Sequence, residues 1–187
     1  LKSERTGNWV RVGQASYLPY PNKTNYEDVV LKQGDIAYLV KGFSPIGISF
    51  RTNKCTGYFN QNRTFYPYLS RYCPLPKNEK LPKFSDVLDR EDECIDIIER
   101  LPYCTDPSLY MNFNKFPDTV SESCKDYLEN EINYDTCVEK HIVDADFAGR
   151  EWYIYMNVFG PLWRDKREKI TLYDSFGLLV ASIEYSY

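Results

Sequence analysis

The chain has 187 residues, of which 43% are hydrophobic and 27% charged, a composition typical of one globular domain or of one domain with a large insertion. Its formal net charge of −4 argues against generic nucleic-acid binding, which needs clustered lysine and arginine to neutralise phosphates. No apolar run approaches the ~20 residues that a membrane-spanning helix needs, so we expect no membrane span in this chain.

The N-terminal part predicts β-structure. Residues 8–12 (NWVRV) alternate in the manner of a short strand. Residues 26–42 predict two short strands around a turn at 33–35, where Gly34 provides the positive φ that such a turn needs. Residues 44–50 predict a loop followed by another short strand.

A cysteine-rich helical segment is expected next, at about 55–147. Residues 85–101 predict a helix that Ser85 caps. A second, short helix is expected after the capping-box residue Thr119, and a third over 133–144.

The C-terminal part returns to β-structure. Residues 151–159 alternate strongly, and residues 168–187 predict two strands joined by a hairpin turn at 174–177. The order of strands, helical segment and strands predicts one domain over 1–187, mostly β, with the helical insertion lying between strands that pair in space.

The cysteine count predicts three disulfides. The six cysteines contain no C-x2-C pair of the kind found in zinc or redox sites, and a zinc site at Cys137 and His141 would still lack two ligands of a plausible spacing. Six cysteines allow fifteen pairings, and sequential pairing is the simplest because it closes short local loops. It would join Cys55 to Cys73, Cys94 to Cys104 and Cys124 to Cys137. Three disulfides imply an oxidising compartment, so we expect a secreted, extracellular or cell-surface protein.

Aromatic residues make up 16% of the chain, and they are concentrated in KCTGYFNQNRTFYPYLSRYCP (54–74). Rings that face inward would cover the core, whereas rings that face outward would form a binding surface for a protein partner or a sugar. The candidate binding residues are Tyr58, Phe59, Phe65, Tyr66, Tyr68 and Tyr72, with Trp163 on a separate loop.

The C-terminal strands resemble the end of a lamin tail domain. The matching positions are Ile170, Leu172, Asp174, Gly177, Val180 and Tyr185, preceded by a strand with Trp152 and Tyr155. The passage 29–42 is similar to the middle of that family, and the first 25 residues match it poorly. The resemblance is closest to a bacterial surface-protein branch with a cysteine-rich helical insertion, and it implies an immunoglobulin-like β-sandwich.

The sequence contains no recognisable set of catalytic residues. His141 is the single histidine and lacks the sequence context of a catalytic triad, and no phosphate-binding glycine motif occurs, so no cofactor is expected. Asp144 and Asp146 resemble the start of a calcium loop, but Ala148 and Tyr155 stand where further ligands are needed. We therefore expect no metal site beyond this weak calcium candidate.

Two N-x-T triplets occur, at Asn22 and Asn62. They bear on function only in a protein made in a eukaryotic secretory pathway. Because the resemblance points to bacteria, we expect both triplets to be ordinary loop residues without a glycan.

The sequence thus favours a non-catalytic extracellular domain with a structural or adhesive role, acting through protein–protein contacts or self-association. Strand pairing in an assembly is the expected mechanism, with the N-terminal segment and the last strand as candidate edges. A carbohydrate-binding module using the exposed aromatic rings is the alternative. A hydrolase with paired carboxylates is a second alternative, for which the sequence offers no predictable pair of facing acids.

Overall fold

The computed structural model describes residues 1–20, 23–84, 88–112, 116 and 120–186. The chain forms two compact units, Leu1–Arg51 with Arg150–Tyr187, and Thr52–Gly149. The described residues form two sheets, three α-helices and three disulfides, so the protein is sheet-rich with a few helices. The predicted insertion at 55–147 falls within the second unit.

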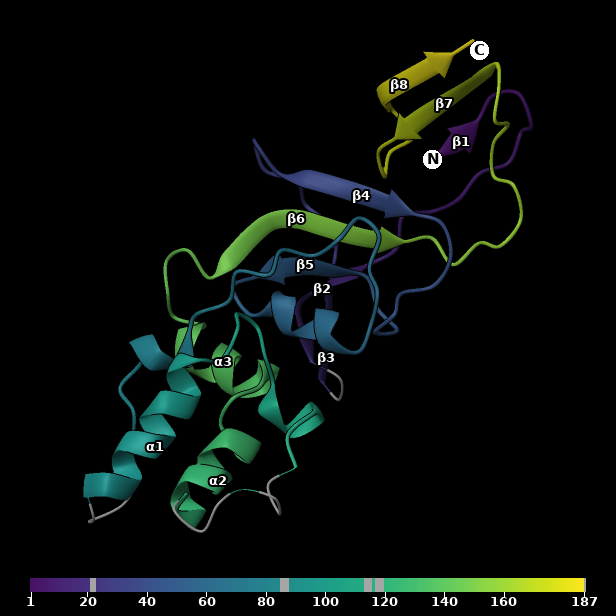
Figure 1. The fold of residues 1–187 in the computed structure, drawn as a ribbon. Coiled ribbons are helices and arrows are strands. Elements are labelled where there is room, and N and C mark those ends of the chain that lie inside the picture. Colours follow the sequence, from purple (N-terminus) through teal and green to yellow (C-terminus); the bar gives the residue numbers. More distant parts are fainter. Residues whose placement is uncertain (21–22, 85–87, 113–115, 117–119, 187) are drawn as a thin grey trace. The chain divides into compact units, whose positions relative to one another are not determined.

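The first unit contains a three-stranded antiparallel sheet in the order β1-β7-β8 (Figure 1). Its strands are β1 (Lys2–Ser3), β7 (Glu168–Tyr173) and β8 (Leu179–Tyr185). The Asp174 carboxylate accepts the backbone N–H groups of Phe176 and Leu178 at 2.9 and 2.8 Å, and Gly177 has a φ of 81°. The predicted hairpin is therefore confirmed.

A five-stranded sheet in the order β3-β2-β5-β6-β4 lies mostly in the same unit, and the end of β5 and the start of β6 belong to the second unit. Its strands are β2 (Ala15–Tyr20), β3 (Lys23–Glu27), β4 (Ile36–Val40), β5 (Phe50–Asn53) and β6 (Ala148–Tyr155). β6 lies between β5 and β4, and its residues from Trp152 onward are buried. Trp152 packs in an apolar cluster with Ala15, while the ring of Tyr153 stacks on that of Phe50 at 5.3 Å.

Two of the strand predictions near the N-terminus are wrong. Residues 8–12 form no strand: Trp9 makes a single bridge to Lys2 of β1 and is 73% exposed, and β1 is only two residues long. The first strand predicted within 26–42 lies at β3 instead, and 28–35 is irregular. The predicted turn at Gly34 is confirmed by its φ of 86°, and β4 follows it.

The second unit contains the helices, as the sequence predicts. They are η1 (Thr56–Gln61), η2 (Pro76–Asn78), α1 (Leu88–Glu99), η3 (Pro107–Leu109), α2 (Glu122–Asn130) and α3 (Tyr134–His141). Ser121 caps α2 and Asn133 caps α3 through side-chain oxygens that accept backbone N–H groups. The predicted caps Ser85 and Thr119 lie outside the described residues. Within the described ranges, no helix combines the length and the apolar character that a bilayer crossing requires.

All six cysteines form disulfides, as predicted, but the sequential pairing is wrong. The bonds join Cys55 to Cys137, Cys73 to Cys104 and Cys94 to Cys124. Packing between elements decides the partners: the rings of Phe59 on η1 and Tyr134 on α3 lie 4.4 Å apart. This contact brings η1 and α3 together, and with them the cysteine before η1 and the cysteine on α3. All three bonds lie inside the second unit.

A buried carboxylate joins β1 to the start of β7. Glu168 is fully buried, and it accepts hydrogen bonds from the hydroxyl of Ser3 at 2.8 Å and from the backbone N–H groups of Arg164 and Lys169 at 3.0 and 2.8 Å. Burial alone would raise the pKa of Glu168, but these donors, with the N–H of Arg5, lower it to about 2.

We expect Glu168→Gln to lower the melting temperature near neutral pH, because the neutral amide cannot accept four donors as well as the carboxylate does. The folded pKa of about 2 lies below the ordinary 4.5, so the charge stabilises the fold above pH 4.5 and loses that effect as the pH falls toward 2. Thermal melts of wild type and variant should therefore converge between pH 4.5 and 2. Glu184→Gln, at an exposed position, is the matched control, and a constant gap across this range would contradict the assignment.

Candidate functional site

The aromatic segment 54–74 splits into an inward and an outward set. Tyr58, Phe59 and Phe65 are buried, and they pack within the second unit. Tyr66, Tyr68 and Tyr72 are 77%, 75% and 81% exposed. Three of these six rings therefore face inward and three face outward.

The outward tyrosines belong to a segment that is anchored at regular intervals. Phe65, Leu69 and Cys73 are buried at every fourth position, and the Asn60 amide donates to the carbonyl of Leu69 at 3.2 Å. The exposed rings therefore stand on a backbone held by core contacts and by the disulfide at Cys73. Such a segment loses little conformational entropy when a partner covers it.

Tyr72 has a ring partner that the sequence did not indicate. The rings of Tyr72 and Tyr103 meet edge to face at 5.7 Å, because the bond between Cys73 and Cys104 joins the residues that follow them. Trp163, the remaining aromatic candidate, lies in the first unit and is half-buried. It lines a shallow depression there with Leu1 and Trp9.

His141 belongs to a network of charged side chains within the second unit. Its Nδ1 lies 2.9 Å from a carboxylate oxygen of Asp144, and its Nε2 lies 3.4 Å from one of Glu79. Glu79 also pairs with Lys140 at 2.8 Å. The His141 ring thus links the end of α3 to the residue after η2, and these contacts stabilise the fold of the second unit. Sequence reasoning missed Glu79, because no local pattern relates it to His141 62 residues away.

Asp144 and Asp146, the weak calcium candidates, both form ion pairs with Lys54. The Lys54 ammonium lies 2.8 Å from Asp144 and 2.5 Å from Asp146. This ammonium, together with the His141 ring, holds the pKa of Asp144 below its usual value. The two carboxylates therefore already share a positive charge supplied by the chain itself. Among the described residues, no cluster of three or more His, Cys, Asp or Glu side chains could hold a metal ion.

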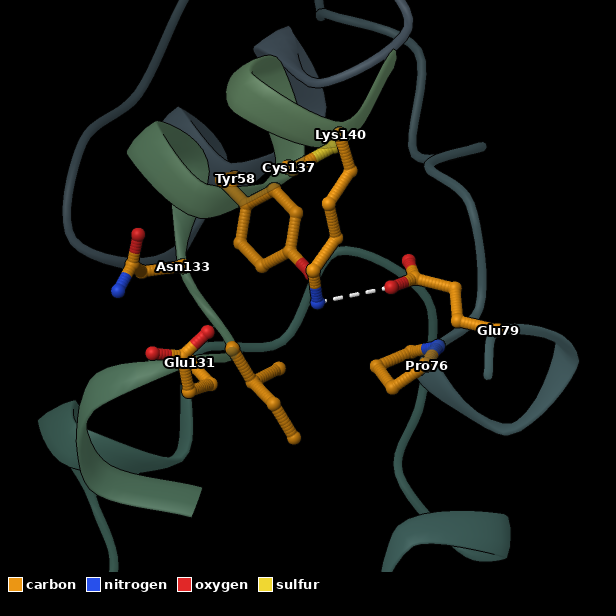
Figure 2. Close-up of a pocket in the computed structure, with 8 residues that line it drawn as sticks. Tyr58, Pro76, Glu79, Glu131, Asn133, Cys137 and Lys140 are labelled. Atoms are coloured by element: carbon orange, nitrogen blue, oxygen red, sulfur yellow. Dashed lines mark ion pairs between the residues drawn. The ribbon is translucent and has the colours of Figure 1, made fainter. Parts of the chain in front are cut away.

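A small cavity lies between η1, η2 and α3 (Figure 2). Its lining includes Tyr58, Glu79, Glu131 and Lys140, and an ion pair joins Lys140 to Glu79. The cavity has a volume of about 10 Å³, which is room for one water molecule. A substrate does not fit this space as it stands.

The outer edge of β8 is the most exposed apolar element of the first unit. Within the described part of the chain, β8 pairs with β7 alone, and its other edge carries no backbone partner. Leu179, Val180 and Ile183 are 62%, 60% and 62% exposed. The sequence named this strand as a candidate edge, and the structure places it at the edge of its sheet. The other candidate, the N-terminal segment, pairs with β7 through β1.

Comparisons with family models, with curated proteins and with solved structures find no match for this chain.

Proposed function

We propose that this protein is a non-catalytic extracellular domain that acts through protein–protein contacts, by pairing the free edge of β8 with a strand of another copy. The observation that carries this proposal is the exposed, apolar edge of β8. An edge strand presents unpaired backbone N–H and C=O groups, and native proteins usually protect such edges with charge, proline or a covering element. β8 has a single charged residue, Glu184, and no proline.

The sequence of β8 is compatible with antiparallel pairing to itself. A register centred on Ser182 would place Ala181 opposite Ile183, and Val180 opposite Glu184. The single charge of each strand then faces an aliphatic side chain rather than its own copy, and like charges directly opposite one another are avoided. This register supports a second copy as the partner.

The extracellular location is supported by the three disulfides, which persist in oxidising compartments. An immunoglobulin-like sandwich of the lamin tail kind remains our proposal for the first unit. It is supported by the two sheets of that unit and by the resemblance at Asp174, Gly177 and Val180.

Carbohydrate binding is the second candidate function, and the exposure of Tyr66, Tyr68 and Tyr72 favours it. Exposed aromatic rings offer flat apolar faces with a polar hydroxyl at one end. In that case the ligand would bind the second unit rather than β8.

We expect Val180→Glu to abolish self-association, because in the register centred on Ser182 the new carboxylate lies opposite Glu184 of the second copy, and like charges directly opposite one another are destabilising. Sedimentation velocity over a range of concentrations should show the wild type moving from monomer toward dimer and the variant staying monomeric. Val143→Glu is the matched control, since Val143 is 87% exposed and lies outside every strand. A wild type that stays monomeric at every concentration would refute the assembly.

A further inference from the structure

We propose that Asn62 is an N-glycosylation site, which accepts an oligosaccharide on its side-chain nitrogen. The triplet Asn62-Arg63-Thr64 has the acceptor pattern N-x-T with a residue other than proline in the middle. The inference goes beyond the proposed assembly and rests only on the proposed secretory route. Glycosylation at Asn62 requires a eukaryotic secretory pathway, whereas the family resemblance points to a bacterial protein.

The local structure presents the whole triplet to solvent. Asn62 follows η1, and Asn62, Arg63 and Thr64 are all exposed. Buried residues flank the triplet, with Phe59 before it at 8% exposure and Phe65 after it at 0%. The triplet is therefore a short exposed turn between two core anchors, and a bulky group there would displace no packed side chain.

The Asn62 amide is also chemically available. Within the described residues it makes no side-chain hydrogen bond, whereas neighbouring asparagines are engaged. Asn53 donates to the hydroxyl of Tyr134, and Asn60 donates to the carbonyl of Leu69. Asn62 thus combines the acceptor pattern with an uncommitted amide. The other triplet begins at Asn22, outside the described residues.

The co-reactant is a polyprenyl-diphosphate-linked oligosaccharide. A bond forms between Nδ2 of Asn62 and C1 of the first sugar, and the bond between that C1 and the diphosphate oxygen breaks. The diphosphate leaves with the electron pair, and the amide nitrogen gives up one proton to solvent. No oxidant or reductant is involved. The disulfides of the second unit form in the same oxidising lumen where such transfer takes place in secreted proteins.

The test is secretion of the full chain from cultured eukaryotic cells, with intact-mass and peptide mapping before and after removal of N-glycans by a peptide amidase. We expect one glycan to map to Asn62. It should be lost in Asn62→Gln and in Thr64→Ala, and kept in Thr64→Ser, which retains the hydroxyl.

Asn78→Gln is the matched control, because Asn78 is exposed but Lys80 stands two residues after it. Melting temperatures of the variants should match that of enzymatically deglycosylated wild type, which separates loss of the glycan from loss of the fold. An unmodified Asn62 in secreted protein with all three disulfides formed would overturn the proposal. The sedimentation test of β8 is independent of this result, so the two proposals fail separately.

Discussion

Replacing Gly57 with alanine is expected to destabilise the protein by about 3 kcal/mol or more, at the upper end of what overpacking a core costs. A Cβ at this position would lie 2.3 Å from Sγ of Cys104, 2.7 Å from the carbonyl oxygen of Ser70 and 2.9 Å from Sγ of Cys73. None of these atoms is the end of a flexible side chain: two belong to a disulfide and one to the backbone. The added methyl group can therefore be accommodated only by shifting η1 or the bonded cysteines.

Urea denaturation of Gly57→Ala and wild type measures the effect. Gly13→Ala is the control, because nothing lies within 4 Å of its Cβ, and loss of chain entropy in the unfolded state leaves such a variant near or slightly above wild type. Equal midpoints for Gly57→Ala and wild type would show that η1 does not approach the disulfide as described.

Removing the Cys55–Cys137 disulfide by double alanine substitution is expected to cost about 4.5 kcal/mol in the chain-entropy model. These cysteines are 82 residues apart, so their bond restricts the unfolded chain more than the others do. The Cys94–Cys124 bond, with a separation of 30, should cost about 3.7 kcal/mol on the same basis.

Equilibrium unfolding of the two double variants, with the remaining bonds verified by mass mapping, tests this order. Cys94 and Cys124 are fully buried, as is Cys55, so the cavities left by alanine are similar and the loop term is the main difference. A smaller loss for Cys55–Cys137 than for Cys94–Cys124 would contradict the loop-length account.

Local signals explain what the sequence could predict. The β7–β8 hairpin was predictable because Asp174 and Gly177 set the turn through their own hydrogen bonds and φ. The presence of disulfides followed from an even cysteine count. The prediction of a strand at 8–12 was wrong because alternating hydrophobicity indicates which side chains face inward, but not whether another strand is available for pairing. In the structure, these residues make a single bridge, at Trp9.

Long-range packing explains what could not be predicted. The partner of Cys55 depends on the contact of Phe59 with Tyr134, which joins residues 75 positions apart in the chain. Which aromatic rings face inward could not be predicted, because 62–75 is neither a helix nor a strand, and the burial of Phe65 and Leu69 depends on contacts with the rest of the second unit. The pair of Tyr72 with Tyr103 follows only once the disulfide between their neighbours is known.

The two ends of the second unit lie against each other. A Cβ on Gly149 would be 2.3 Å from Oγ1 of Thr52, and the N–H of Lys54 donates to the carbonyl of Phe147 at 3.0 Å. A segment whose entry and exit are this close can change in length or content over evolution without moving its two points of attachment. The second unit thus begins and ends at nearly the same point, and the absence of a side chain at Gly149 is what allows this close approach to Thr52.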